Sequence, residues 1–120
     1  MSDATSIHLE THLKVLRLLE ANPQMNQRDL AVALGVSLGK TNFCLKALLD
    51  KGWLKVQNFQ NSQRKLAYAY LLTPVGLAEK TTLTRRFLMR KKEEFVLLKA
   101  EIELLQQEAA ADPHALEQSL

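Results

Sequence analysis

The sequence has little of several residue types that would each define a class of protein. A single cysteine, Cys44, excludes an internal disulfide and favours a reducing compartment such as the cytoplasm. Aromatic residues make up 6% of the chain, and no apolar run approaches the roughly 20 residues that cross a bilayer, so we expect no membrane partner. The polar start, MSDATS, lacks the basic and apolar regions of a signal peptide. What is present, 47% hydrophobic and 24% charged residues in a chain of 120, is typical of one compact domain with an extension.

Groupings that support catalysis or metal binding are also missing from the sequence. We find no nucleophile with a base, no glycine-rich phosphate loop and no paired carboxylates, so we expect neither an enzyme nor a cofactor. His8 and His12 are four residues apart, but no further metal ligands lie nearby in sequence, and we interpret both as ordinary surface histidines. We interpret Cys44 as a buried small hydrophobe rather than a redox-sensing thiol.

Charge is distributed unevenly along the chain. Residues 101–120 contain five acids and no lysine or arginine, whereas residues 1–99 contain all 16 basic residues and eight acids. A basic body indicates a polyanionic partner such as a nucleic acid.

The first predicted helix covers residues 7–21, and Asn22-Pro23 stops it because the residue before a proline is driven out of the helical region. Its leucines recur at helical spacing, at Leu9, Leu13, Leu16 and Leu19.

Two shorter helices, 27–34 and 38–51, follow and are joined by a short connection. Each begins at a capping residue and ends at a glycine that can take a left-handed conformation. The caps are Asn26, with Asp29 completing a capping box, and Ser37; the glycines are Gly35 and Gly52. So tight a turn makes the second helix cross the first steeply, which exposes one face for a DNA major groove. The predicted outward face consists of Leu38, Gly39, Lys40, Asn42, Phe43 and Lys46.

Each outward residue type suits a contact with double-stranded DNA. Asn42 can read adenine, and Lys40 can reach guanine or a phosphate. Gly39 lets the backbone come close, and Phe43 can contact a thymine methyl group or fold back onto the core. Lys46 can contact DNA or remain solvated. Phosphate contacts are expected from Ser37 at the helix start and from Gln27 and Arg28.

After Gly52 the period of the pattern changes to that of strands. Residues 53–57 and 66–72 alternate, and the polar segment 58–65 between them predicts a hairpin with a long basic tip. This tip is expected to act as a wing that follows the minor groove or its phosphates, although it could also be a soluble loop. Its predicted DNA contacts are Asn61, Arg64 and Lys65.

Residues 10–77 resemble a MarR-type winged helix, in which the second strand ends in an L-T-P-x-G motif, here Leu72 to Gly76. The segments LGVSLGKTNFCLKALLDKG and LTRRFLMRKKEEF are similar to short MarR-family regulators associated with exopolysaccharide gene clusters. The resemblance implies a cytoplasmic bacterial dimer that acts on polysaccharide-related genes. The chain is shorter than full-length MarR proteins, whose extra helices frame a ligand pocket.

From Pro74 to about residue 111 nothing stops a helix of roughly 55 Å. A heptad pattern runs along it and is apolar in its second half, which predicts pairing with a second chain. The predicted dimer contacts are Leu88, Phe95, Leu98, Ile102 and Leu105. Folding back onto the first helix is the alternative, but that helix is too short to cover this one. The pattern leaves the direction of pairing open.

Together these features predict a mainly α fold with a small β-hairpin: a winged helix-turn-helix domain over residues 1–73, a dimerisation helix over 74–111 and a disordered tail over 112–120. The function expected is a homodimeric transcriptional regulator on a palindromic operator. A winged-helix adaptor for protein interactions and a ligand-sensing regulator are the alternatives. The operator, the sign of regulation and any effector do not follow from the residues.

Overall fold

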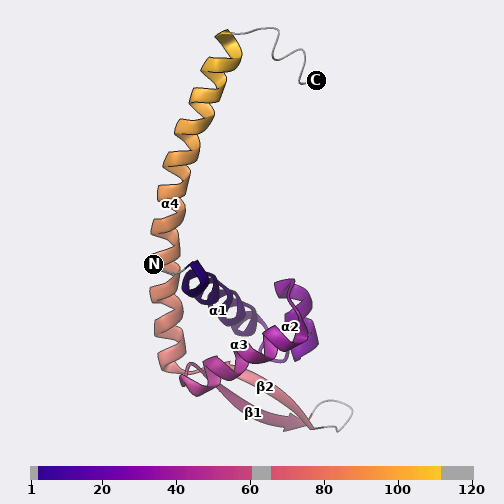
Figure 1. Ribbon diagram of the computed structural model, residues 1–120. Helices are drawn as coiled ribbons and strands as arrows, with labels where there is room; N and C mark the ends of the chain where they lie inside the picture. Colours follow the sequence, from indigo (N-terminus) through magenta and orange to yellow (C-terminus); the bar gives the residue numbers. More distant parts are fainter. Residues whose placement is uncertain (1–2, 61–65, 112–120) are drawn as a thin grey trace. The chain divides into compact units, whose positions relative to one another are not determined.

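The computed structural model describes residues 3–60 and 66–111, and it is mainly helical with one antiparallel hairpin, as the sequence predicts (Figure 1). The elements are α1 (Asp3–Ala21), α2 (Gln27–Leu34), α3 (Leu38–Asp50), β1 (Leu54–Gln60), β2 (Leu66–Leu72) and α4 (Pro74–Ala111). The chain divides into two units, residues 1–85 and residues 86–120, and the division falls within α4. The predicted wing contacts Asn61, Arg64 and Lys65 and the predicted tail 112–120 lie outside the described residues.

Three predicted boundaries were wrong by a few residues. The first helix begins at Asp3, four residues earlier than the leucine stripe indicates. Helix α3 ends at Asp50 in a tightened last turn, because the Lys51 N–H donates to the Ala47 carbonyl and the Gly52 N–H donates to the Leu49 carbonyl three residues earlier. Strand β1 begins one residue later than predicted. It continues to Gln60, because Asn58, Phe59 and Gln60 of the predicted loop pair with β2.

The predicted helix caps are confirmed. The Asn26 side chain accepts a hydrogen bond from the Asp29 N–H at 2.7 Å, and the Asp29 carboxylate accepts one from the Asn26 N–H at 3.4 Å, which completes the capping box. Ser37 Oγ accepts from the Lys40 N–H at 3.1 Å. Gly35 and Gly52 have φ values of 69° and 74°, a region that favours glycine.

The core of the first unit lies where α1, α2 and α3 meet the start of the hairpin. The face of α1 buries its leucine stripe from Leu13 onward, and these side chains contact the inward faces of α2 and α3. Burying one leucine contributes about 1.5–3 kcal/mol, so this cluster accounts for much of the unit's stability. Its fully buried members are Val15, Leu16, Leu19, Leu30, Thr41, Leu45 and Leu48.

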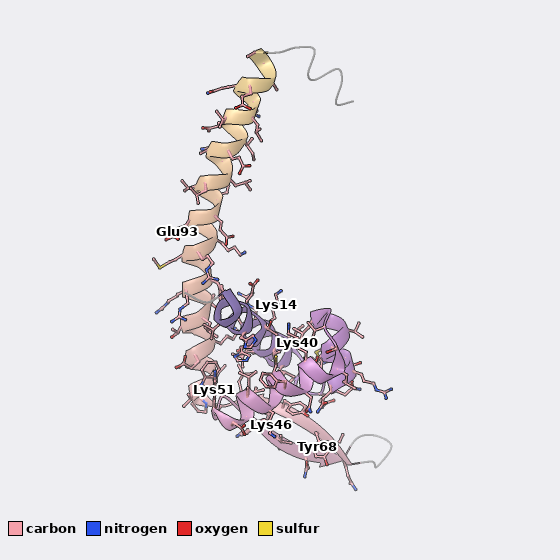
Figure 2. The ribbon with its side chains drawn as sticks, viewed as in Figure 1. Lys14, Lys40, Lys46, Lys51, Tyr68 and Glu93 are labelled. Atoms are coloured by element: carbon pink, nitrogen blue, oxygen red, sulfur yellow. The ribbon has the colours of Figure 1, made fainter. Side chains whose placement is uncertain are left out.

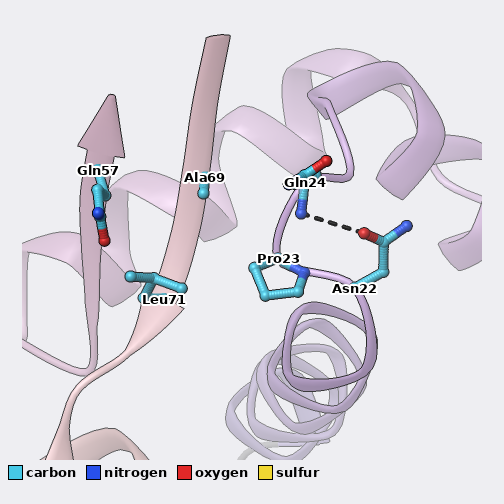
Figure 3. Close-up of a pocket in the computed structure, with 6 residues that line it drawn as sticks. All are labelled: Asn22, Pro23, Gln24, Gln57, Ala69 and Leu71. Atoms are coloured by element: carbon cyan, nitrogen blue, oxygen red, sulfur yellow. Dashed lines mark hydrogen bonds between the residues drawn. The ribbon is translucent and has the colours of Figure 1, made fainter. Parts of the chain in front are cut away.

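The two strands pair in one register from Leu54 opposite Leu72 to Gln60 opposite Leu66. The turn after α1 adds to the free edge of β2, since the Tyr70 N–H donates to the Pro23 carbonyl at 3.0 Å. Figure 3 shows Pro23 beside β2, with an open cavity of about 400 Å³ between them that uncharged side chains line. The hairpin is therefore tied to the turn after α1 through β2.

The start of α4 is held against the residue that precedes β1. Thr73 Oγ1 accepts from the Gly76 N–H at 3.0 Å and donates to the Gly52 carbonyl at 2.5 Å. A Cβ placed on Gly76 would overlap the carbonyl oxygen of Trp53, so only glycine fits this approach. This contact gives the L-T-P-x-G pattern its physical basis.

In the second unit, α4 continues as a helix with a large exposed apolar surface. Exposed side chains include Phe95 at 64%, Leu97 at 72% and Leu98 at 54%. No single helix in the described ranges is long and apolar enough to cross a membrane; α2 and α3 pass that test only when taken together, as a pair bent by 108°.

Candidate nucleic-acid interface

Helices α2 and α3 meet at a sharp turn. The chain changes direction by 108° between them, within the 90–120° of a helix-turn-helix. The turn is tightened by the Val36 N–H, which donates to the Ala31 carbonyl at 3.1 Å, and by Gly35, whose N–H donates to the Val32 carbonyl at 3.2 Å. The geometry predicted from the three-residue connection is thus the one observed.

The two faces of α3 differ sharply in exposure. Every residue of the predicted outward face is exposed: Leu38, Gly39, Lys40, Asn42, Phe43 and Lys46. The residues between them, Thr41, Cys44, Leu45 and Leu48, are at most 4% exposed. Lys40 and Lys46 lie along α3, and Tyr68 lies on the hairpin below it in the view of Figure 2. One face of α3 therefore packs against the core, and the opposite face is exposed to solvent.

The N-terminus of α3 is positively charged in character. Its first turn contains no acidic residue, and Ser37 caps it while Lys40 follows one turn later. Buried Thr41 strengthens this end, because its Oγ1 donates to the Ser37 carbonyl at 3.0 Å. Free N–H groups at such an end attract phosphate.

The two predicted phosphate contacts at the start of α2 differ in exposure. Arg28 is exposed. Gln27 is half-buried and its Nε2 donates to Tyr70 Oη at 3.5 Å, which links α2 to the hairpin. Tyr68, which is not among the predicted contacts, shares a strand face with Tyr70 and is 58% exposed. The alternation of tyrosines with alanines in β2 places both tyrosines on this face.

Phe43 does not fold back onto the core. It is 63% exposed, and its ring contacts the edge of His8, with ring centroids 6.4 Å apart. Between these two rings and Lys40 lies a cavity of about 110 Å³, which Thr11, His12 and Cys44 complete.

The interpretation of both histidines as surface residues was wrong for His12. His8 is exposed, but His12 is 6% exposed and packs edge-on against Trp53, with ring centroids 6.5 Å apart. Burial lowers the pKa of His12 to about 4, and nearby Lys51 and His8 contribute to this lowering. Its Nδ1 has no hydrogen-bond partner among the described residues.

Cys44 is buried, in agreement with its interpretation as a small hydrophobe. Burial raises the pKa of its thiol more than the charge of Lys40 lowers it. Within the described ranges, no three His, Cys, Asp or Glu side chains are grouped in a way that could hold a metal ion.

Comparison with known proteins agrees with this geometry. Residues 9–55, which include α2, α3 and the first strand residues, match the family model of winged helix-turn-helix DNA-binding domains. The chain has a winged helix-turn-helix fold. No curated protein matches it in sequence.

Solved structures extend the match of this winged-helix protein to most of its length. A putative transcriptional regulator of Thermoplasma acidophilum superposes with a TM-score of 0.64 at 18% identity, covering 79% of this chain and 96% of its own. The PcaV transcriptional regulator of Streptomyces coelicolor gives 0.62 at 19% identity, covering 92% and 79%. A MarR/EmrR family transcriptional regulator of Acinetobacter gives 0.54 at 19% identity, covering 90% and 75%. Structural similarity at 18–19% sequence identity shows that this chain shares the fold of these proteins.

The predicted dimer contacts all lie exposed on α4 of the winged-helix protein. Their exposed fractions are 45–64%, at Leu88, Phe95, Leu98, Ile102 and Leu105. An apolar row this exposed is typical of an interaction surface.

Proposed function

We propose that the chain is a MarR-type transcriptional regulator that binds double-stranded DNA through α3 and acts as a homodimer on a palindromic operator. One observation carries the proposal: α3 buries one face completely and presents Gly39, Lys40, Asn42 and Lys46 on the other, at a helix start without acids. Amide and ammonium groups on an exposed helix face are suited to base edges and phosphates.

The homodimer supplies the second reading helix. Two copies of α3 separated by about 34–36 Å would meet successive major grooves on one side of the duplex. The exposed apolar row from Leu88 to Leu105 offers the surface for pairing. Arg28 and the wing tip, with Asn61, Arg64 and Lys65, are the proposed phosphate contacts beside the groove.

Three finer statements complete the proposal. The regulator works in the bacterial cytoplasm and needs no catalytic group or cofactor. Its resemblance to regulators of exopolysaccharide clusters makes polysaccharide-related genes the expected targets. Tyr68 and Gln27 are proposed to border the DNA surface, because Gln27 joins α2 to the hairpin and Tyr68 lies exposed on it.

Gel shifts with the full chain test the reading helix. We expect Asn42→Ala and Lys40→Ala each to weaken binding to a preferred site about 10- to 100-fold, and Lys40→Ala also to flatten the salt dependence by about one phosphate contact. Lys51→Ala is the matched control, because it removes the same charge from the residue that follows the far end of α3. If Asn42→Ala and Lys40→Ala both bind like the unmodified chain and the Lys51→Ala control at every salt concentration, α3 is not the reading helix. A chain that retains no DNA even at low salt would instead favour the protein-interaction adaptor.

A second candidate, a regulator that responds to a small molecule, is favoured by the cavity beside α3. That cavity is lined by His12, whose buried Nδ1 has no partner among the described residues, and by Lys40 and Phe43, two of the proposed DNA contacts. The PcaV regulator has been solved in complex with its natural ligand. A thermal-shift screen followed by gel shifts tests this candidate: it requires a metabolite that both stabilises the chain and releases DNA, and it requires His12→Phe to abolish both effects.

A further inference from the structure

The exposed row on α4 is bordered by charges of opposite sign on its two sides. With Phe95 and Ile102 at heptad position a, and Leu98 and Leu105 at position d, the flanking g positions are all acidic and the flanking e positions are basic or neutral. The g residues are Glu94, Glu101 and Glu108, and the e residues are Lys92, Lys99 and Gln106. All six are exposed.

We propose that two copies of this chain pair through α4 as a parallel, in-register coiled coil, with Glu94 of each copy contacting Lys99 of the other. This orientation rests on the proposed homodimer and specifies it. In a parallel pair each g residue faces the e residue five positions later in the partner, so Glu94 meets Lys99 and Glu101 meets Gln106.

An antiparallel pair would bring like charges together. There the g positions face one another, so Glu94 would meet Glu108 and Glu101 would meet its own copy, while Lys99 would also meet its own copy. The charge pattern therefore disfavours this direction.

The apolar residues agree with the parallel direction. Isoleucine at position a with leucine at position d is the combination that two-stranded parallel coils prefer, and Ile102 lies between Leu98 and Leu105 in that arrangement. Lys91, the next d position toward the N-terminus, interrupts the apolar row between Leu88 and Phe95. Its Nζ lies 3.2 Å from Glu94 Oε2 in the same helix, an exposed contact that Glu94 can exchange for Lys99 of the other copy.

A parallel pair has a consequence for DNA binding. Both copies of α4 begin at Pro74, directly after the hairpin, so in a parallel pair both winged domains are joined to the same end of the paired helices. Two reading helices joined to the same end of the paired helices can bind one DNA duplex.

Charge reversal distinguishes the two directions by the sign of its effect. In the full chain, Glu94→Lys would set two ammonium groups against each other in a parallel dimer, the new one and that of Lys99, and raise the dimer Kd about 10-fold. Adding Lys99→Glu would restore the Kd. In an antiparallel dimer the same Glu94→Lys change would meet Glu108 and tighten the dimer. Sedimentation equilibrium measures the Kd in each case.

Cross-linking tests the register. In a Cys44→Ser background, Leu105→Cys lies opposite its own copy in the parallel dimer and forms a disulfide-linked dimer on mild oxidation, whereas in an antiparallel dimer the two thiols are separated by about ten residues of helix, roughly 15 Å. Leu98→Glu should abolish dimers, and its exposed neighbour Leu97→Glu, off the seam, should leave them intact. A chain that is monomeric throughout overturns the homodimer itself. A dimer that Glu94→Lys tightens, or that Leu105→Cys cannot link, overturns only the parallel pairing.

Discussion

Gly39 lies on the outward face of α3 with open space around it. A Cβ at this position meets nothing within 4 Å, so Gly39→Ala is compatible with the fold. Alanine is the better helix former, and we expect the variant to be more stable by up to about 1 kcal/mol. If α3 enters the major groove as proposed, the added methyl group instead weakens DNA binding, because it separates the backbone from the bases. Thermal unfolding and gel shifts on the same samples measure the two effects, and a variant that binds DNA at full strength would show that the backbone does not approach it.

His12 makes stability depend on pH. Its pKa is about 4 in the folded chain against an ordinary 6.5, so between these values the unfolded chain binds a proton that the folded chain excludes. Stability therefore falls as the pH is lowered through this window, by about 1–3 kcal/mol in total from this residue. Urea unfolding followed by fluorescence of Trp53, the sequence's single tryptophan, measures the effect.

The control for this prediction is His12→Phe, which keeps a ring against Trp53 and cannot titrate. Its stability should depend less steeply on pH between 6.5 and 4 than that of the unmodified chain. Parallel curves for the two proteins would mean that His12 titrates normally in the fold.

At the scale of elements, the junction between the hairpin and α4 is the least tolerant point. Gly76 lies so close to Trp53 that a Cβ would come within 2.9 Å of its carbonyl carbon. We expect Gly76→Ala to destabilise the chain by about 1–3 kcal/mol, because backbone must shift to relieve the overlap. Val75→Ala, at an exposed neighbour, is the control. A melting temperature of Gly76→Ala equal to that of the control would contradict this account of the motif.

How well an element could be predicted depends on how local its determinants are. The capping box at Asn26, the cap at Ser37 and the outward face of α3 each follow from residues within one or two helical turns, and all are as predicted. The end of β1 depends on pairing with β2, so the polar residues Asn58 and Gln60 gave no local sign of a strand.

The same reasoning explains the errors in the site. The burial of His12 depends on Trp53, which is distant in sequence, and an i, i+4 histidine pair has the same spacing whether it faces solvent or core. The cavity beside α3 needs residues from two helices and could not be read from either alone.

At the scale of the whole molecule, the charged residues have two roles in the proposed account. The basic residues of the winged domain, such as Arg28, Lys40 and Lys46, favour DNA and make its binding sensitive to salt. The charges at Glu94 and Lys99 border the apolar row of α4 and set the direction of pairing. A regulator built this way reads DNA with one unit and pairs with its second copy through the other.

Selection of binding sites from a random pool of double-stranded DNA, using the full chain, tests this claim most directly. The account predicts an inverted repeat whose half-sites are about 10–11 base pairs apart, bound by two chains per duplex, with Asn42→Ala losing discrimination at one base position in each half-site. Enrichment of no sequence, or of an asymmetric site bound by one chain and read equally well by Asn42→Ala, would contradict it.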